Sequence, residues 1–204
     1  MTGKFLDKAY DLDGADKTQA HYDAWAATYD AEISENGYAT PGRCAAALWA
    51  KLPRPDAPIL DFGCGTGLSG LALKLAGYRV IDGTDPSVEM LEGARAKNVY
   101  RTLSALDLSD PAPIPTGRYR AIAAIGVIGT GAAPARTLDL LMKTLGRGDF
   151  LVFSYNDHAL ADPHYVGRLN QWLDCGAARL ITKDYGPHLH GQNLNSNVYV
   201  VEKN

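Results

Sequence analysis

The amino-acid sequence predicts an α/β fold built on a sheet of seven mostly parallel strands, with helices on both faces. From residue 58 onward, short apolar runs alternate with segments of helical periodicity, and this alternation is typical of parallel βαβ units. The first apolar run ends in a carboxylate and is followed by a turn with three alternate glycines. A length of 204 residues suits one such domain with a modest extension.

The N-terminal part of the chain is expected to be helical. Tyr22, Trp25 and Tyr29 recur at helical spacing, which predicts an amphipathic helix over about 16–31. A second helix is expected over about 41–49, and it ends before two closely spaced prolines because proline cannot continue a helix.

The sheet and its helices are expected to follow in order. Strands are predicted at 59–62, 79–83, 99–103, 119–127, 150–155, 179–184 and 195–202, and helices at 68–76, 87–97, 134–145 and 163–175. No change of composition divides these elements, so we expect a single domain over 1–204, with a helical segment over 1–55 and the sheet core over 56–204.

Composition excludes several classes of protein. The formal net charge is −3 without a Lys/Arg cluster, so a nucleic acid is not expected as a partner. No stretch approaches the roughly 18 consecutive apolar residues of a membrane helix. The first residues have mixed charge and no apolar core of a secretory signal, so we expect a cytoplasmic protein.

The cysteines and histidines predict neither disulfides nor a metal site. Cys44, Cys64 and Cys175 are odd in number and widely scattered, so reduced thiols are expected. His188 and His190 have the spacing to share one strand face, but two imidazoles without a further ligand do not define a metal site.

The segment 59–70 reads Ile-Leu-Asp-Phe-Gly-Cys-Gly-Thr-Gly-Leu-Ser-Gly and predicts a nucleotide-type cofactor site. Alternate glycines permit positive φ and close approach of a ligand, while the amides that open the next helix point outward as donors. Gly65, Gly67 and Gly70, with Asp85 twenty positions after Gly65, also satisfy the dinucleotide fingerprint. The glycines alone therefore leave NAD open as the cofactor.

Asp61, at the carboxyl end of the first strand, distinguishes between the two candidate cofactors. A carboxylate there would crowd the pyrophosphate of NAD but would suit the ammonium and sulfonium charges of S-adenosylmethionine. At ~4 Å, a like-charge contact costs ~4 kcal/mol at an effective dielectric constant of 20, and an opposite-charge contact gains a similar amount. We therefore expect S-adenosylmethionine as the cofactor.

Two blocks, 60–67 and 82–91, together with the Tyr-Asp-x-Trp-Ala-x-x-Tyr-Asp run over 22–30, resemble the class I S-adenosylmethionine-dependent methyltransferases. Adding Val-Tyr-Arg at 99–101 and Gly-Val at 126–127, the chain is most similar to the methyltransferase-like group that includes the human Williams–Beuren-region protein. The resemblance implies a Rossmann-like sheet whose last strand is antiparallel, and an N-terminal helical lid over the cofactor.

The resemblance also implies a set of cofactor-binding residues, namely Tyr29, Asp61, Gly63, Cys64, Gly65, Thr66, Gly67, Asp85, Pro86, Met90, Asp107 and Gly126. Asp61 would reach the cationic amino-acid end, directly or through water, and Asp85 would accept both ribose hydroxyls. Pro86 and Met90 would border the adenine, and Asp107 would accept a hydrogen bond from its amino group. Capping of the next helix by Asp85, and an exposed turn for Asp107, are the structural alternatives.

The expected reaction is an in-line methyl transfer to a small molecule. The sulfonium is already a good leaving group, so the protein aligns the acceptor and excludes water. Tyr29 and His158 are candidate catalytic residues, the latter as a general base. The sequence lacks the Asp/Asn-Pro-Pro-Tyr/Phe motif of many DNA-base methyltransferases.

Two other functions remain open at this point. A non-catalytic S-adenosylmethionine-binding regulatory protein would share every cofactor motif. An NAD-dependent oxidoreductase is less favoured, because Tyr165 is followed four positions later by Leu169 and not by the lysine of a Tyr-x-x-x-Lys pair. The residues specify neither the acceptor atom nor the oligomeric state.

Overall fold

In a computed structural model, which describes residues 5–8, 12, 14–107, 110 and 114–204, the strands form one seven-stranded sheet. Its spatial order is β3-β2-β1-β4-β5-β7-β6. The strands are β1 (Ile59–Phe62), β2 (Ile81–Asp85), β3 (Thr102–Ala105), β4 (Ala121–Ala124), β5 (Phe150–Asn156), β6 (Ala178–Leu189) and β7 (Leu194–Lys203). The predicted seven-stranded sheet is confirmed.

The direction of the last strand also agrees with the prediction. Neighbours from β3 to β5 pair in parallel, whereas β7 is antiparallel to both β5 and β6. The strand order reverses at β1, which has β2 on one side and β4 on the other. Ligands of open α/β sheets bind outside the carboxyl ends of the strands at such a reversal.

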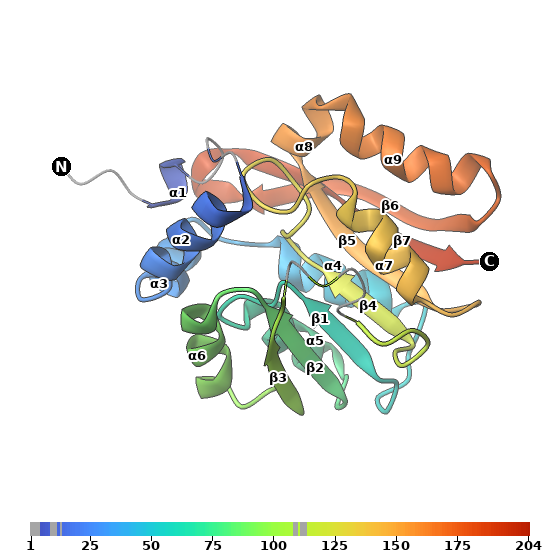
Figure 1. Ribbon diagram of the computed structural model, residues 1–204, viewed down its shortest axis with the longest axis horizontal. Coiled ribbons are helices and arrows are strands. Elements are labelled where there is room, and N and C mark those ends of the chain that lie inside the picture. Colours follow the sequence, from blue (N-terminus) through green and yellow to red (C-terminus); the bar gives the residue numbers. More distant parts are fainter. Residues whose placement is uncertain (1–4, 9–11, 13, 108–109, 111–113) are drawn as a thin grey trace.

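Helices cover both faces of the sheet, and a group of N-terminal helices lies at one end of it (Figure 1). The helices are α1 (Phe5–Lys8), α2 (Ala15–Trp25), α3 (Tyr29–Glu35), α4 (Thr40–Trp49), α5 (Leu68–Ala76), α6 (Val88–Ala96), α7 (Thr137–Thr144), α8 (Asp157–Ala161) and α9 (Pro163–Asp174), with a short 3-10 turn, η2 (His190–Gln192). Among the described residues, none of the helices is long and apolar enough to cross a membrane.

Successive residues of the strands feed two separate cores. Ile59 packs with α4 and α5 on one face, and its neighbour Leu60 packs with α7 and α9 on the other. The central strands are buried at every position, as expected for parallel strands covered on both faces. The sheet therefore holds the ends of β1, β2 and β4 on a rigid base.

The predicted N-terminal helix over 16–31 is wrong in one respect, because the chain breaks it into α2 and α3. The amide of Thr28 bonds the carbonyl of Trp25, an i to i−3 contact that tightens the turn. The Thr28 hydroxyl then donates to Glu32 at 2.9 Å. The aromatic residues of the two helices still gather in one cluster with Leu189 of β6.

Other boundaries differ from the prediction by a few residues. Strand β2 begins two residues later and runs to Asp85, which places this carboxylate at the carboxyl end of the strand. Strand β6 extends to Leu189, five residues beyond the predicted end. Helix α8 was not predicted, and its N-cap is Asn156, whose side chain accepts from the Ala159 amide.

Candidate functional site

The glycine turn after β1 adopts the predicted backbone. Gly63, Gly65 and Gly67 all have positive φ, at 69°, 51° and 93°, which is unfavourable for other residues. A Cβ on Gly63 would lie 2.6 Å from Cγ2 of Val127, whereas a Cβ on Gly65 would meet no atom within 4 Å. Gly63 therefore allows close packing, and Gly65 leaves open space above the turn.

A cavity of about 430 Å³ lies over this turn, between the N-terminal helices and the segment after β4. This volume is in the usual range for a small-molecule or cofactor site. Ten of the predicted cofactor-binding residues line it: Tyr29, Gly63, Cys64, Gly65, Thr66, Asp85, Pro86, Met90, Asp107 and Gly126. The structure thus brings together most of the residues singled out by the sequence.

Asp85 is held rigidly at the edge of this cavity. Its Oδ2 accepts from the Gly65 amide at 2.8 Å, and its Oδ1 accepts from the Ser87 amide at 2.9 Å. Burial raises the pKa of Asp85, and these two backbone amides oppose the rise. The N-cap of α6 is Ser87, whose hydroxyl accepts from Met90, so Asp85 does not cap the helix.

Asp61 and Gly67, the other two predicted cofactor-binding residues, are not among the residues that line this cavity. Asp61 is fully buried beneath the turn. Its Oδ2 accepts from the Ser69 hydroxyl at 2.6 Å and from the Tyr100 hydroxyl at 2.7 Å. Burial raises the pKa of Asp61 to about 6, against the opposing effect of these hydrogen bonds. Gly67 is the left-handed N-cap of α5.

Cys64 faces the cavity but is not a candidate nucleophile. Burial, with the nearby charges of Asp61 and Asp85, raises the pKa of its thiol. A thiol in such surroundings stays protonated and unreactive. The cysteine contributes its backbone to the turn, where its carbonyl accepts from the Gly67 amide at 2.8 Å.

The N-terminal helices are tied to the cofactor turn by polar contacts. Lys97, the C-cap residue of α6, donates to Asp30 of α3 at 2.5 Å and to the Thr66 carbonyl at 2.7 Å. The Thr66 hydroxyl also donates to Asp30. We call Asp30, Thr66 and Lys97 the lid latch. Gln19 of α2 adds a hydrogen bond to the Pro86 carbonyl at 3.1 Å. These contacts close α2 and α3 over the larger cavity.

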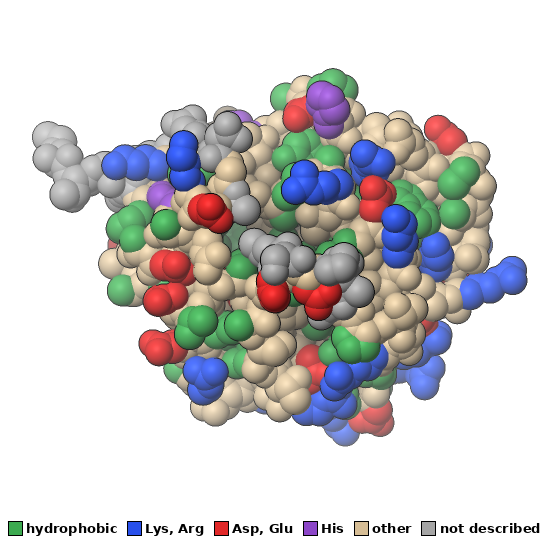
Figure 2. All heavy atoms as spheres, viewed as in Figure 1, with side chains coloured by type: hydrophobic (Ala, Val, Ile, Leu, Met, Phe, Trp, Pro, Cys, Tyr) green, Lys and Arg blue, Asp and Glu red, His purple; other side chains and the backbone are tan. Residues whose placement is uncertain are grey.

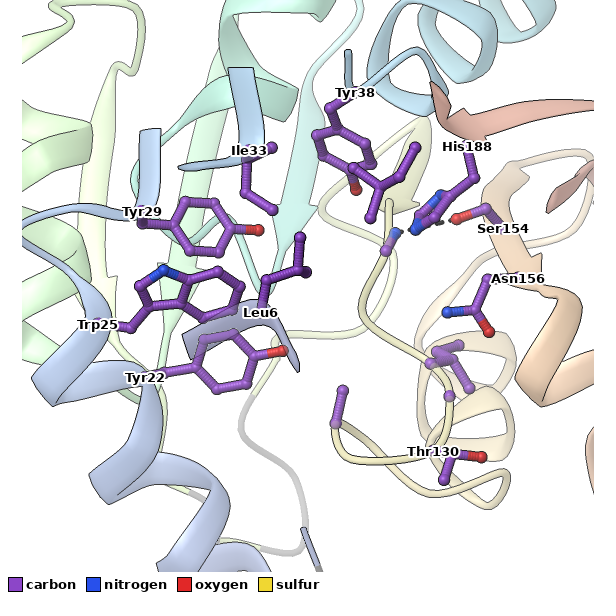
Figure 3. A pocket seen from close by; sticks show the side chains of 15 residues that line it. Leu6, Tyr22, Trp25, Tyr29, Ile33, Tyr38, Thr130, Ser154, Asn156 and His188 are labelled. Carbon is purple, nitrogen blue, oxygen red and sulfur yellow. Dashed lines mark hydrogen bonds between the residues drawn. The ribbon is translucent and has the colours of Figure 1, made fainter. Parts of the chain in front are cut away.

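A second, smaller cavity of about 50 Å³ adjoins the first (Figure 3). The two share the wall residues Tyr22, Tyr29, Tyr38, Gly126 and Ala132. Figure 3 shows aromatic side chains from α2 and α3 on one side, facing polar side chains of the sheet on the other. The rings of Trp25 and Tyr29 meet edge to face at 4.6 Å.

The polar side of the smaller cavity comes from β5 and β6. Ser154, Asn156 and His188 line it, and none of the described lining residues is Asp, Glu, Lys or Arg. Tyr38 crosses the junction, since a Cβ on Gly126 would lie 2.2 Å from the Tyr38 hydroxyl oxygen. Gly126, with φ 72°, is thus required where the two cavities meet.

Two histidines considered from the sequence are outside the site. His158 is exposed on α8 and lines neither cavity, which argues against a general-base role. His190 lies in η2, with its Nδ1 bonded to the Gly37 carbonyl at 3.0 Å. Among the described residues, no group of three or more His, Cys, Asp or Glu side chains is arranged to hold a metal.

Several lining residues carried no sequence signal. Gln19 and Tyr38 lie outside the recognised blocks, and Tyr38 reaches the site because it forms a β-bridge with Leu189. Ser154 is a small polar residue near the carboxyl end of an apolar strand, and that position was the one available clue.

Comparison with known proteins identifies a family for the sequence. A methyltransferase domain family matches residues 38–197. Methyltransferase-like protein 27 of Homo sapiens is 36% identical over 126 residues, which are 60% of this chain and 51% of the human protein. The chain thus spans about half the length of this curated relative.

Solved structures share the fold at low sequence identity. A chain from the complex between the Haloferax volcanii Trm112 methyltransferase activator and a methyltransferase matches with TM-score 0.69 and 16% identity, covering 91% of this chain and 97% of that one. Magnesium protoporphyrin IX methyltransferase from Synechocystis PCC 6803 with bound S-adenosylmethionine matches with TM-score 0.61 and 17% identity, covering 98% and 90%.

The fold, the glycine turn and the matched family together define the class of protein. The chain belongs to the class I S-adenosylmethionine-dependent methyltransferases, and S-adenosylmethionine is its cofactor.

Proposed function

We propose that this protein transfers a methyl group from S-adenosylmethionine to a small molecule, with the cofactor in the larger cavity and the acceptor in the smaller one. The observation that carries the proposal is the junction of the two cavities at Gly126. The helices over 1–55 then act as a lid of the same domain as the sheet core over 56–204.

The residues of the larger cavity fit the cofactor. Gly65 leaves open space for it above the turn. Asp85, fixed by two backbone amides, then accepts the ribose hydroxyls. Pro86, Met90 and Asp107 then border the adenine, and the methionine end lies toward the junction. The buried carboxylate of Asp61 acts on the cofactor's positive charge through the turn.

The bound cofactor supplies an electrophilic methyl group on a sulfonium. The chain's own residues bring the acceptor to it at about 3–3.5 Å and in line. Tyr22, Tyr29 and Tyr38 enclose the path between the cavities, and the lid latch excludes water from it. No covalent intermediate with the enzyme is required.

A small acceptor is favoured over a polymer. A cavity of about 50 Å³ admits only a few atoms while the lid is closed. The formal net charge is −3, which does not favour a nucleic acid, and in Figure 2 acidic side chains lie mainly on the left and centre of the face while basic ones lie mainly on the right and lower right. The free cysteines Cys44, Cys64 and Cys175 suit a reducing cytoplasm.

Isothermal titration calorimetry with S-adenosylhomocysteine tests the cofactor site. Asp85→Ala should weaken binding by about 1.5–3 kcal/mol, the value of a hydrogen bond to a charged group. Ser87→Ala is the matched control, because it removes the α6 cap and leaves the carboxylate in place. Unchanged affinity in Asp85→Ala, or an equal loss in both variants, would refute the ribose assignment.

The function itself is tested by incubating the protein with S-adenosylmethionine and pools of metabolites, and measuring S-adenosylhomocysteine formed. Acceptor-dependent formation is expected. Binding of NAD without binding of S-adenosylhomocysteine would contradict the proposal, and tight cofactor binding without turnover over a broad pool would instead indicate a regulatory binding protein.

A further inference from the structure

Three side chains on the sheet side of the smaller cavity share one property: an acceptor atom of each already accepts a hydrogen bond from another group of the protein. They are Ser154, Asn156 and His188. Each of them still has a hydrogen-bond donor to offer to the cavity. The following inference concerns the acceptor and rests on the proposed function.

Asn156 presents its amide nitrogen to the cavity. Its Oδ1 accepts from the Ala159 amide at 3.0 Å as the N-cap of α8. A backbone N–H can only donate, so this contact fixes the orientation of the side-chain amide. Figure 3 shows the nitrogen of Asn156 on the cavity side and the oxygen turned away.

Ser154 is arranged similarly. Its hydroxyl oxygen accepts from the Gly126 amide at 3.0 Å, drawn as the dashed line in Figure 3. This contact ties β5 to the junction of the two cavities and leaves the hydroxyl hydrogen of Ser154 to donate.

The protonation of His188 is set by a buried chain of hydrogen bonds. Arg43 can only donate, and its Nη1 lies 3.1 Å from the Ser196 hydroxyl oxygen. The Ser196 hydrogen is then directed to Thr40, 3.0 Å away. The Thr40 hydroxyl in turn donates to Nδ1 of His188 at 2.8 Å.

In this direction, the hydroxyl hydrogens of Ser196 and Thr40 each have an acceptor in the series of hydrogen bonds. In the reverse direction, the hydroxyl hydrogen of Ser196, which is fully buried, would have no acceptor within that series. Because Nδ1 accepts, a neutral imidazole carries its proton on Nε2. Burial lowers the pKa of His188 to about 4, so the ring is neutral at physiological pH.

Local backbone irregularity directs the imidazole into the cavity. The β6–β7 register shifts between Pro187 and Leu189, so His188 occupies a bulge, a feature that changes the direction of a side chain. Figure 3 shows its ring on the cavity wall beside Tyr38 and Ser154. The ring packs edge to face on Tyr38 at 5.2 Å.

We propose that this wall binds an oxygen of the methyl acceptor, a carbonyl or carboxylate oxygen, through donors from Ser154, Asn156 and the Nε2–H of His188. His188 then acts in acceptor binding and specificity, and not as a base. A benzene ring occupies a cavity of about 150 Å³, so the cavity of about 50 Å³ takes only the oxygen-bearing end of the acceptor.

Three probes of the same planar shape test the chemistry: acetate, acetamide and acetamidinium. Acetate offers only hydrogen-bond acceptors, acetamide offers an acceptor and donors, and acetamidinium offers only donors. We expect acetate, acetamide or both to cause saturable NMR shifts of the Asn156 amide and the His188 ring in the full-length protein. Comparing acetate with acetamide shows whether the site binds a carboxylate or a carbonyl oxygen. Acetamidinium that binds as well as the better oxygen probe would overturn the proposal.

Variants test the role of His188 with the same probes. His188→Gln keeps an N–H donor close to the position of Nε2 and should bind within about threefold of wild type, whereas His188→Leu should lose at least about tenfold. Equal binding by His188→Leu and wild type would overturn the proposal.

The tautomer is measured independently by ¹⁵N NMR of the imidazole. Wild type should show protonated Nε2 and unprotonated Nδ1 at pH 7, and Thr40→Val should lower the fraction of this tautomer. Thr144→Val is the control, because its hydroxyl bonds Leu140 on α7. A wild-type ring protonated on Nδ1 would refute the hydrogen-bond chain. Calorimetry with S-adenosylhomocysteine separates this failure from failure of the proposed function.

Discussion

We expect Asp61→Asn to stabilise the cofactor-free protein at neutral pH, although it removes a charge from the recognised motif. The carboxylate is fully buried under the turn, and the described structure gives it two hydroxyl donors, Ser69 and Tyr100, without an ion pair. Asparagine keeps one acceptor oxygen for these donors and avoids burying a charge.

The magnitude follows from the pKa. Burial raises the pKa of Asp61 from 3.8 to about 6, which corresponds to about 3 kcal/mol. Because the folded pKa lies above the unfolded value, this stabilising contribution is present below the unfolded pKa and is lost as the pH rises through about 6. The variant should exceed wild type in free energy of unfolding by roughly 2–3 kcal/mol at pH 8 and by less than about 1 kcal/mol at pH 4.

Urea unfolding at several pH values measures this difference, and Asp82→Asn is the matched control. Asp82 is also buried, on the neighbouring strand. Burial acts to raise its pKa, but hydrogen bonds from Arg101, Thr102 and Tyr119 overcome this effect and lower it. Asp82→Asn should therefore destabilise the protein at pH 8. If both variants change stability in the same direction, the reasoning from burial is wrong.

Three other changes separate stability from binding. Lys97→Met, which opens the lid latch, should speed dissociation of S-adenosylhomocysteine by about tenfold in stopped-flow measurements, or about 1.4 kcal/mol, whereas Lys74→Met should not; equal rates would exclude a latch. Gly63→Ala should cost about 1–3 kcal/mol of stability in thermal unfolding, because its Cβ meets Val127, and Gly65→Ala should chiefly weaken cofactor binding; identical profiles would contradict this. The pKa of His188 is about 4 in the folded protein, below the value of 6.5 in the unfolded chain, so wild type should lose about 3 kcal/mol of stability as the pH falls from 6.5 to 4. Urea unfolding should show that His188→Gln does not lose this contribution.

The cofactor half of the site was accessible from the sequence because its constraints are local. Positive φ at Gly63 and Gly65 demands glycine, and the carboxylate of Asp85 must end its strand. Such requirements produce short motifs. Asp61 was placed on the correct strand, but the donors that hold it beneath the turn come from α5 and from residue 100, which no local pattern reveals.

The half of the site that we assign to the acceptor was not predictable in the same way. Ser154, Asn156 and His188 are brought together by pairing of distant strands, and His188 depends on Thr40, 148 positions away. A histidine near the end of a strand has no sequence signature that separates a buried donor from an exposed side chain. The break between α2 and α3 was missed because the aromatic periodicity continues across it.

The bulge at His188 also makes the proposed acceptor wall sensitive to the length of strand β6. Removing one residue there would restore regular β6–β7 pairing, and a one-residue slip moves a side chain to the opposite face of a sheet. The imidazole would leave the cavity, while the glycine turn, Asp85 and the lid latch would be unchanged. If the proposed acceptor wall is correct, a single-codon deletion at this hairpin should change the acceptor preference and leave the methyl-donor site intact.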